Sequence, residues 1–300
     1  MTVILTRVDV LLMETLADHR VLTSAQAAQA VHLPMSTANY RLNRLRQAGL
    51  LTRKRPPART GTSPLHWWLT NTGRRRVGEP GRVPDAWSSD LFLAHTVATA
   101  AVPLALDRHG PSVGLHLRAW QREPREAWST AQGTQRLTPD GYALVRVDAE
   151  DAEVPLLVEV DRATMAPERL REKTRRYLRY TAADAWRERH AMCPVLLVLT
   201  TTEDRAAKTL AAAARERQRI LGPTGELLVG VCGQVETIDR SITDPVWRAD
   251  HNDDGDTARD RLRTLTEVLT YRIHTERDGR HLPPWEQTYT PAGGLTADAQ

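Results

Sequence analysis

The chain has 300 residues, of which 41% are hydrophobic and 26% charged, so it is long enough for two ordinary domains with buried cores. This composition excludes a low-complexity tail protein, and no run approaches the roughly eighteen apolar residues that a membrane span needs. Two cysteines are too few for a disulfide framework or an all-cysteine zinc site. The first residues lack the charged segment and long apolar run of an export signal, so we expect a cytoplasmic protein with no membrane association.

The net charge of +4 is distributed unevenly along the chain. Residues 1–83 hold thirteen Lys and Arg side chains against four Asp and Glu, so this third is basic and the remainder is acidic. A basic module of this kind indicates an anionic partner, most simply nucleic acid. Only three residues are lysines (Lys54, Lys173 and Lys208), which weakly favours a specific role for each of them in an arginine-rich chain.

The basic third is predicted to begin with three short helices. Apolar residues at helical spacing predict a first helix over 6–18 capped by Thr6, and a second over 25–31 capped by Thr23 or Ser24. A third helix is predicted from a Ser36 cap to Ala48, followed by Gly49 where a left-handed cap is expected. Two strands, over 50–53 and 65–70, are predicted next, joined by a basic loop rich in proline and glycine.

Three helices and a hairpin in this order predict a winged helix-turn-helix, whose last helix enters the major groove of DNA. Hydroxyl and amide groups near the start of that helix can read base edges, and arginines can hold phosphates or guanine. The predicted DNA-binding residues are Thr37, Tyr40, Arg41 and Arg44 on the helix and Arg53, Lys54, Arg55 and Arg59 on the wing. The simpler alternative is that these are solvated surface charges. Of Trp67 and Trp68, which alternate on the second strand, one is expected in the core.

Glycine and proline over 77–87 predict a linker between a DNA-binding domain, 1–76, and a second domain, 88–281. The elements predicted in the second domain are a helix over 90–108, strands over 113–120, 142–148 and 155–161, a helix over 167–185, a strand over 195–200, a helix over 203–221, a strand over 226–232 and a helix over 257–275. Two of the strands are apolar throughout, which is typical of central strands in an α/β fold. The last helix is expected to pack on this domain or to form a dimer contact, and residues 282–300 predict a disordered tail.

Three acidic residues mark the ends of neighbouring strands in this domain. Glu159 and Asp161 share one face of a strand because side chains alternate, and Asp140 opens the adjacent strand. Carboxylates on a central strand need a cation, a basic side chain or a shared proton. Oxygen ligands of this kind suit Mg²⁺ or Mn²⁺, which can activate water at a phosphodiester. The sequence therefore predicts a metal site formed by Asp140, Glu159 and Asp161; the alternative is an ion-pair network that braces helix to sheet.

Pro139-Asp140 followed by Glu159-Val160-Asp161 resembles the PD-(D/E)XK nuclease motif, with Asp161 in the place of the usual lysine. Some members of that superfamily take the lysine from the next helix, where Lys173 lies. The resemblance implies a nuclease-like α/β/α domain with Asp140, Glu159, Asp161 and Lys173 as its catalytic residues.

The order of several short motifs resembles the replication-relaxation proteins of plasmids and integrative elements. The motifs are Val21-Leu22-Thr23-Ser24, Leu69-Thr70, His95-Thr96, Trp120 with Glu123, Pro139-Asp140, Glu159-Val160-Asp161-Arg162 and Lys173 with Tyr177. The resemblance implies a role in plasmid replication and DNA relaxation, with double-stranded DNA as partner, and it adds His95 and Glu123 to the site. Two functions stay open: a metal-dependent DNA endonuclease, or a non-enzymatic DNA-binding regulator or replication accessory protein with an inactive nuclease-like domain. A homodimer or a complex with other replication or transfer proteins is the expected assembly.

Overall fold

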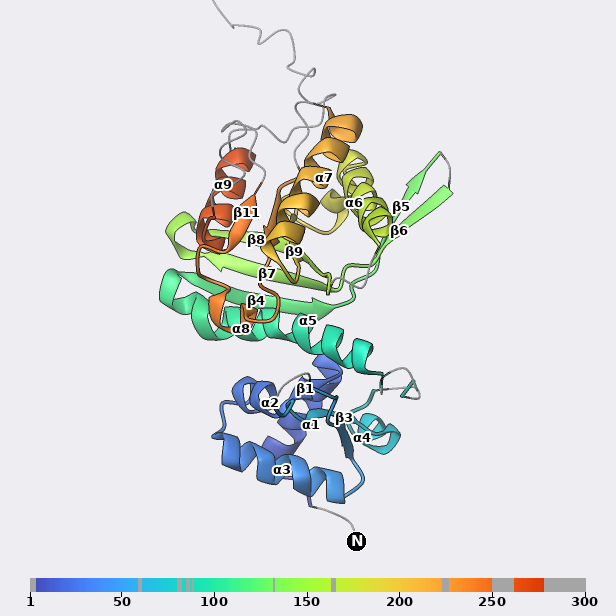
Figure 1. The fold of residues 1–300 in the computed structure, drawn as a ribbon, viewed down its shortest axis with the longest axis vertical. Helices are drawn as coiled ribbons and strands as arrows, with labels where there is room; N and C mark the ends of the chain where they lie inside the picture. The colour runs from blue at the N-terminus through green and yellow to red at the C-terminus, as the bar shows by residue number, and fades with distance from the viewer. Residues whose placement is uncertain are drawn as a thin grey trace, which may run out of the picture.

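A computed structural model describes residues 4–58, 61–79, 83–84, 87, 89–131, 133–162, 166–222, 227–249 and 262–277. Within these residues the protein is a mixed α/β structure with two units stacked along its long axis (Figure 1). We call the part from α1 to α4, with a three-stranded sheet, the N-terminal unit. The part from α5 to α9, with a six-stranded sheet, is the α/β unit. Arg59 and the predicted tail, 282–300, lie outside the described residues.

Three helices begin the N-terminal unit: α1 (Arg7–His19), α2 (Ser24–Ala30) and α3 (Met35–Gln47). Capping boxes formed by Thr6 with Asp9 and by Thr23 with Gln26 start α1 and α2, which confirms both predicted caps. The predicted Ser36 cap is wrong, because Pro34 takes the N-cap position of α3 and no side chain caps this helix.

The sheet of this unit has the order β1-β3-β2. Its strands are β1 (Leu22–Thr23), β2 (Leu51–Lys54) and β3 (His66–Leu69), and α4 (Asn71–Arg76) follows them. Trp67 and Trp68 on the central strand are both buried, so the prediction of a single core tryptophan is wrong. Trp67 packs with the apolar residues of α1 and α3, whereas Trp68 packs on the other side of the sheet with Trp87 and Leu93.

The sheet of the α/β unit has the order β11-β10-β9-β8-β7-β4. Its strands are β4 (Leu115–Arg122), β7 (Gly141–Val147), β8 (Ala152–Val160), β9 (Val195–Leu199), β10 (Val229–Cys232) and β11 (Trp247–Ala249). β4, β7 and β8 are antiparallel, and β9 and β10 continue the sheet parallel to β8. The apolar runs of β8 and β9 are buried on both faces, as the sequence predicts.

Helices cover both faces of this sheet. The helices are α5 (Asp90–His109), α6 (Pro167–Ala182), α7 (Glu203–Leu221), α8 (Ile238–Ser241) and α9 (Leu265–Arg277). α6 and α7 pack on the face that carries Leu157 and Leu196, whereas α5, α8 and α9 pack on the face that carries Leu156 and Leu197. The unit is therefore a three-layered α/β/α arrangement (Figure 1).

Sequence reasoning missed a hairpin between β4 and β7. Its strands, β5 (Glu126–Thr130) and β6 (Gly133–Leu137), form a separate two-stranded sheet that projects beside α6 (Figure 1). Trp128 anchors the hairpin, because its ring lies edge-on to that of Tyr180 with centroids 5.3 Å apart.

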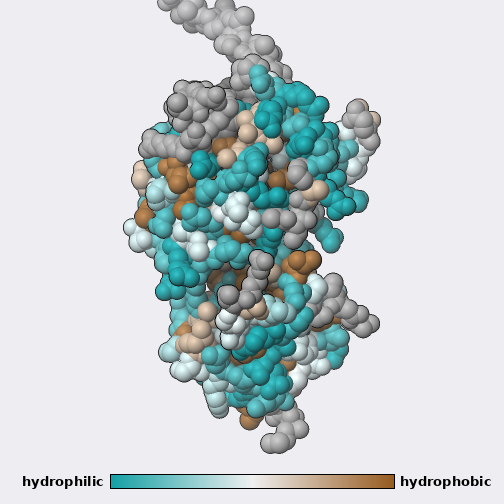
Figure 2. All heavy atoms as spheres, viewed as in Figure 1, coloured by the Kyte–Doolittle hydropathy of each residue, from teal (hydrophilic) through white to brown (hydrophobic). Residues whose placement is uncertain are grey.

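α5 is apolar on nearly all sides because it serves two cores. Ala101 and Ala105 pack on the six-stranded sheet, whereas Ala100 and Leu104 pack in the core of the N-terminal unit. By length and composition, the segment Asp90–Val113 is the one part of the described chain that could cross a membrane. Its most apolar window is 61% buried inside the protein, as in the core helix of a folded unit. Hydrophilic side chains cover most of the face shown in Figure 2.

Candidate functional site

The outer face of α3 carries polar side chains at the end of the molecule far from the α/β unit (Figure 1). Ala38, Leu42 and Leu45 face the core of the N-terminal unit. The exposed side chains of α3 are Met35, Ser36, Tyr40, Arg46 and Gln47, and Tyr40 is 67% exposed. Thr37, near the start of the helix, is half-buried.

Arg41 and Arg44, predicted to contact DNA, bind a buried carboxylate of α1 instead of extending freely into solvent. Their guanidinium groups lie 3.1 Å and 3.0 Å from the two oxygens of Asp9, which is fully buried. Burial alone would raise the pKa of Asp9, but hydrogen bonds from Thr6 and Arg41 and the charge of Arg44 outweigh it, so this pKa lies below its usual value. These ion pairs fix α3 against the start of α1, and DNA contact by the two arginines stays a prediction.

The basic residues of the β2–β3 hairpin are also tied to their surroundings. Arg53 donates to the side-chain oxygen of Asn43 on α3 at 2.9 Å, and its guanidinium lies 5.1 Å from the ring centre of Trp67. Lys54 lies 2.8 Å from Asp90 at the start of α5, and Arg55 donates to a loop carbonyl of the hairpin. These contacts connect the hairpin to α3 and to the α/β unit.

In the α/β unit, Glu159 and Asp161 are 4% and 2% exposed and face the layer formed by α6 and α7. The Nζ of Lys173 and the hydroxyl of Tyr177, one turn apart on α6, donate to the two oxygens of Glu159. The Nε of Arg205, from α7, donates to Asp161 at 2.5 Å. The two helices therefore supply the basic partners that the buried carboxylates of β8 require.

Asp140 lies immediately before β7, which pairs with β8, so it comes close to the end of β8. One of its oxygens accepts a 2.8 Å hydrogen bond from the backbone N–H of Val160, and the other lies 3.3 Å from Nε2 of His95 on α5. Burial raises the pKa of Asp140, but the His95 hydrogen bond and the charge of Lys173 outweigh it and lower this pKa to about 2. His95 thus joins the cluster.

Glu123, the other residue added by the resemblance, lies next to Asp140, because its backbone N–H donates to the backbone carbonyl of Asp140 at 3.1 Å, but its side chain points toward the N-terminal unit. Its carboxylate pairs with Arg20 at the end of α1 and faces Arg122 at 3.9 Å. The side chain of Glu123 therefore connects the α/β unit to the N-terminal unit, whereas its backbone contacts Asp140.

The same surroundings shift the pKa values of Glu159 and Lys173 for different reasons. Burial, and secondarily the charge of Asp140, raise the pKa of Glu159 to about 8. Burial would lower the pKa of Lys173, but the nearby charges of Glu159 and Asp140 outweigh it and raise this pKa. The surroundings therefore favour the charged form of Lys173 and the protonated form of Glu159.

The oxygens of the cluster are already engaged by the protein itself. Both oxygens of Glu159 and both of Asp140 accept hydrogen bonds or face a basic group, and Asp161 is bound to Arg205. Among the described residues, no group of three or more His, Cys, Asp or Glu side chains is placed to hold a metal ion. As arranged here, the donor set does not fit the predicted Mg²⁺ or Mn²⁺ site, because an ion would have to displace Lys173 or Tyr177.

Two contributors to this site differ in the signal that they leave in the sequence. Tyr177 lies four residues after Lys173, the helical spacing that places both on one face of α6. Arg205 leaves no such signal, since it lies on another helix, 44 residues after Asp161 in the chain. Trp120 supports the site from β4: its ring covers Gly141, where a Cβ would lie 2.1 Å from the ring carbon Cη2.

Comparison with curated proteins gave no match, and neither did comparison with solved structures. A sequence model of the family described as Replication-relaxation matches residues 13–196. The matched region runs from α1 to the start of β9 and contains α3, Asp140, Glu159 and Lys173. It covers more than half of the chain and confirms the resemblance seen in the motifs: the protein belongs to the replication-relaxation family.

Proposed function

We propose that the protein binds double-stranded DNA during replication of a plasmid or another mobile element, using α3 and the β2–β3 hairpin. Membership of the replication-relaxation family supports the biological setting. Three helices followed by a hairpin match the order of a winged helix-turn-helix, whose last helix enters the major groove. The observation that carries the proposal is the exposed polar face of α3, a helix that lies at the end of the molecule far from the α/β unit (Figure 1).

We assign base contacts to the exposed polar residues of α3. The hydroxyls of Ser36 and Tyr40 and the amide of Gln47 can read base edges, and Arg46 can hold a phosphate. Arg41 and Arg44 act mainly as positioning residues, because Asp9 already holds their guanidinium groups. The side chains that read DNA are then neighbours of the two arginines singled out by the sequence.

The proposal is tested by selecting duplexes from a random pool and measuring affinity for the selected site by fluorescence anisotropy. Affinity should fall steeply with salt, because phosphate contacts release counterions. Gln47→Ala should weaken binding to the selected site by roughly tenfold and binding to random duplex much less. Gln121→Ala, an exposed amide on β4, is the matched control. Failure to select a site, or equal affinities of these two variants for it, contradicts base reading by α3.

We propose further that the α/β unit is a nuclease-like accessory domain without catalytic activity. The order α5, β4, β7, β8, α6, β9 is similar to the PD-(D/E)XK core, which supports the fold assignment. The hydrogen bonds that Lys173 and Tyr177 donate to Glu159, and the ion pair of Asp161 with Arg205, support a polar network that braces helices to sheet.

A metal-dependent endonuclease is the second candidate, favoured by the convergence of Asp140, Glu159 and Lys173 on one site. A cleavage assay distinguishes the two candidate functions: supercoiled plasmid is incubated with the protein and Mg²⁺ or Mn²⁺, with Glu159→Gln as control. An accessory domain leaves the plasmid intact, and neither metal raises the melting temperature of the protein. Nicking that disappears in Glu159→Gln, together with a metal-dependent rise in melting temperature, establishes the enzyme instead.

A further inference from the structure

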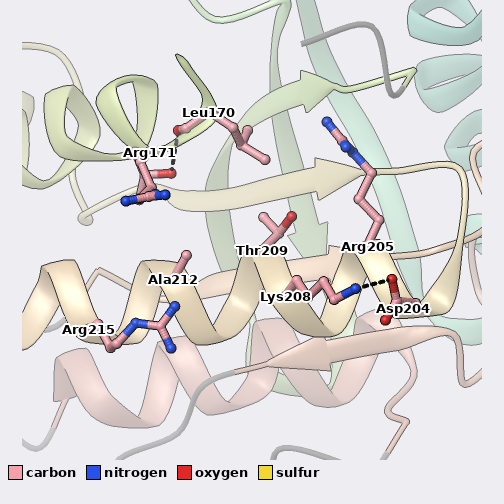
Figure 3. A pocket seen from close by; sticks show the side chains of 9 residues that line it. Leu170, Arg171, Asp204, Arg205, Lys208, Thr209, Ala212 and Arg215 are labelled. Atoms are coloured by element: carbon pink, nitrogen blue, oxygen red, sulfur yellow. Dashed lines mark hydrogen bonds and ion pairs between the residues drawn. The ribbon is translucent and has the colours of Figure 1, made fainter. Parts of the chain in front are cut away.

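A second basic surface lies next to the acidic cluster, with which it shares Arg205, in a hollow of about 380 Å³ between α6 and α7 (Figure 3). Four cationic side chains line it: Arg171 from α6 and Arg205, Lys208 and Arg215 from α7. Asp204 is the one acidic side chain in the lining. We call this hollow the α6–α7 groove. Its surroundings are strongly hydrophilic in the space-filling view (Figure 2).

Three of these cations are available to a ligand. Lys208 pairs with Asp204 at 2.7 Å, but the two side chains are 75% and 73% exposed. Arg171 pairs with Glu168 in a similarly exposed contact at 3.1 Å. Exposed pairs of this kind contribute little to stability, so an anionic ligand can replace the carboxylate. No described residue forms an ion pair with Arg215, and Arg205 is held by Asp161 as part of the scaffold.

The groove is formed before any ligand arrives. Arg175 on α6 donates to Glu216 on α7 at 2.7 Å and so joins the two helices. This hydrogen bond is the main reason that the pKa of Glu216 is lowered to about 2, which keeps the pair ionised at neutral pH. The small side chains of Thr209 and Ala212 project from α7 toward α6 and leave room above them (Figure 3). A bound ligand therefore need not separate the helices.

The spacing of the cations favours an extended anion over a small one. Lys208 and Arg215 lie seven residues apart on the same side of α7, which corresponds to about 10 Å along the helix. Successive phosphates of one DNA strand advance by about 3.4 Å along the duplex axis, so the row is long enough for several of them. We propose that the α6–α7 groove binds the phosphodiester backbone of DNA, as a second contact surface beside α3. This inference rests on the proposed DNA-binding function.

The position of the groove gives this second contact a distinct role. α3 lies at one end of the molecule, and α6 and α7 belong to the other unit (Figure 1). DNA held in the groove is therefore a segment other than the few base pairs that α3 covers. The groove carries no base-reading pattern, so it adds affinity that is independent of sequence.

The test uses two double variants. The groove variant carries both Lys208→Glu and Arg215→Glu, and the control carries both Arg176→Glu and Arg240→Glu. The control changes the net charge equally at exposed positions outside the groove. The probes are a 30-base-pair duplex of mixed sequence and a 30-nucleotide dT strand. The groove variant should bind about tenfold more weakly than the control, with a salt dependence reduced by about two phosphate contacts. Equal affinities of the groove variant and the control for both probes overturn the inference. A loss on either probe supports it and identifies which form of backbone the groove binds.

A third variant, Tyr40→Ala with Arg46→Glu, separates this inference from the proposed function of α3. If the α3 variant loses affinity for duplex and the groove variant does not, the proposed function stands and the groove inference fails. If only the groove variant loses affinity, the inference stands and the role proposed for α3 fails. Far-UV circular dichroism of all three variants confirms that a loss of binding is not a loss of fold.

Discussion

Buried carboxylates determine where the basic side chains of this protein point. Asp9 in α1 holds Arg41 and Arg44, and the carboxylates at the end of β8 hold Lys173 and Arg205. A charge without a partner in a protein interior is costly, so each of these acids commits a neighbouring base to it. The basic residues that a sequence assigns to DNA or to catalysis are therefore partly structural.

Asp9→Asn should destabilise the N-terminal unit by about 2 kcal/mol, because the two arginines lose their anion but stay partly hydrated. Urea unfolding at neutral pH measures the loss, and Glu14→Gln, an exposed acid on the same helix, is the control. The pKa of Asp9 in the folded protein lies below 3.8, so the advantage of the wild type is present above that pH and is lost as the pH falls through the folded pKa. A gap between wild type and variant that persists unchanged at lower pH contradicts this account.

Glu159 should make the stability of the protein depend on pH in the opposite direction from Asp9, and Glu159→Gln should remove this dependence. The pKa of Glu159 rises from 4.5 to about 8 on folding, so between these values the folded protein keeps a proton that the unfolded chain has released. The stability of the wild type should therefore fall as the pH rises through this window, with a slope of at most about 1.4 kcal/mol per pH unit from this group. Glu159→Gln removes that slope in denaturant melts between pH 5 and 8. Parallel curves for wild type and variant would show that burial does not hold the proton on Glu159.

At the scale of elements, the sequence predicts those helices and strands that carry local signals. Thr6 and Thr23 cap α1 and α2 as expected, and the apolar runs of β8 and β9 identify the centre of the sheet. The β5–β6 hairpin was missed because a buried Glu126 interrupts its apolar alternation, and its burial depends on contacts with Tyr180 and Arg189 further along the chain. Local pattern cannot reveal a strand whose inward face begins with a carboxylate.

The acidic site was predictable where strand register alone fixes it. Gly141 pairs with Val158, so Asp140 must come close to Glu159, and the next helix brings Lys173 to the same place. The partners of the predicted DNA-binding arginines were not predictable, since Asp9 and Arg41 are 32 residues apart and no spacing rule joins them. Pairing between charged side chains far apart in the chain leaves no periodic pattern in the sequence. It accounts for most of the difference between the predicted site and the site in the structure.

At the scale of the whole molecule, the two units share α5 and are connected by polar contacts around it. The side-chain amides of Gln26 and Gln29 on α2 donate to the carbonyls of Val97 and Leu104 on α5 at 2.9 Å and 2.7 Å. Arg122 on β4 donates to the carbonyl of Asp18 at the end of α1 at 2.8 Å. With Ala100 and Leu104 in the N-terminal core, these contacts couple the units, so we expect them to unfold together.

Ala100→Asp tests this coupling, because Ala100 is buried against the N-terminal core and does not belong to the core cluster under the six-stranded sheet. A carboxylate there has no partner and should displace α5 from the N-terminal unit while leaving the core under the six-stranded sheet intact. The wild type should unfold in one transition, with the same midpoint by far-UV circular dichroism and by tryptophan fluorescence. The variant should show two transitions, whereas Ala207→Asp, at an exposed position on α7, should keep one. A single transition in Ala100→Asp, merely shifted to lower temperature, would mean that the coupling does not depend on this face of α5 and is carried by the polar contacts of α2 and β4 instead.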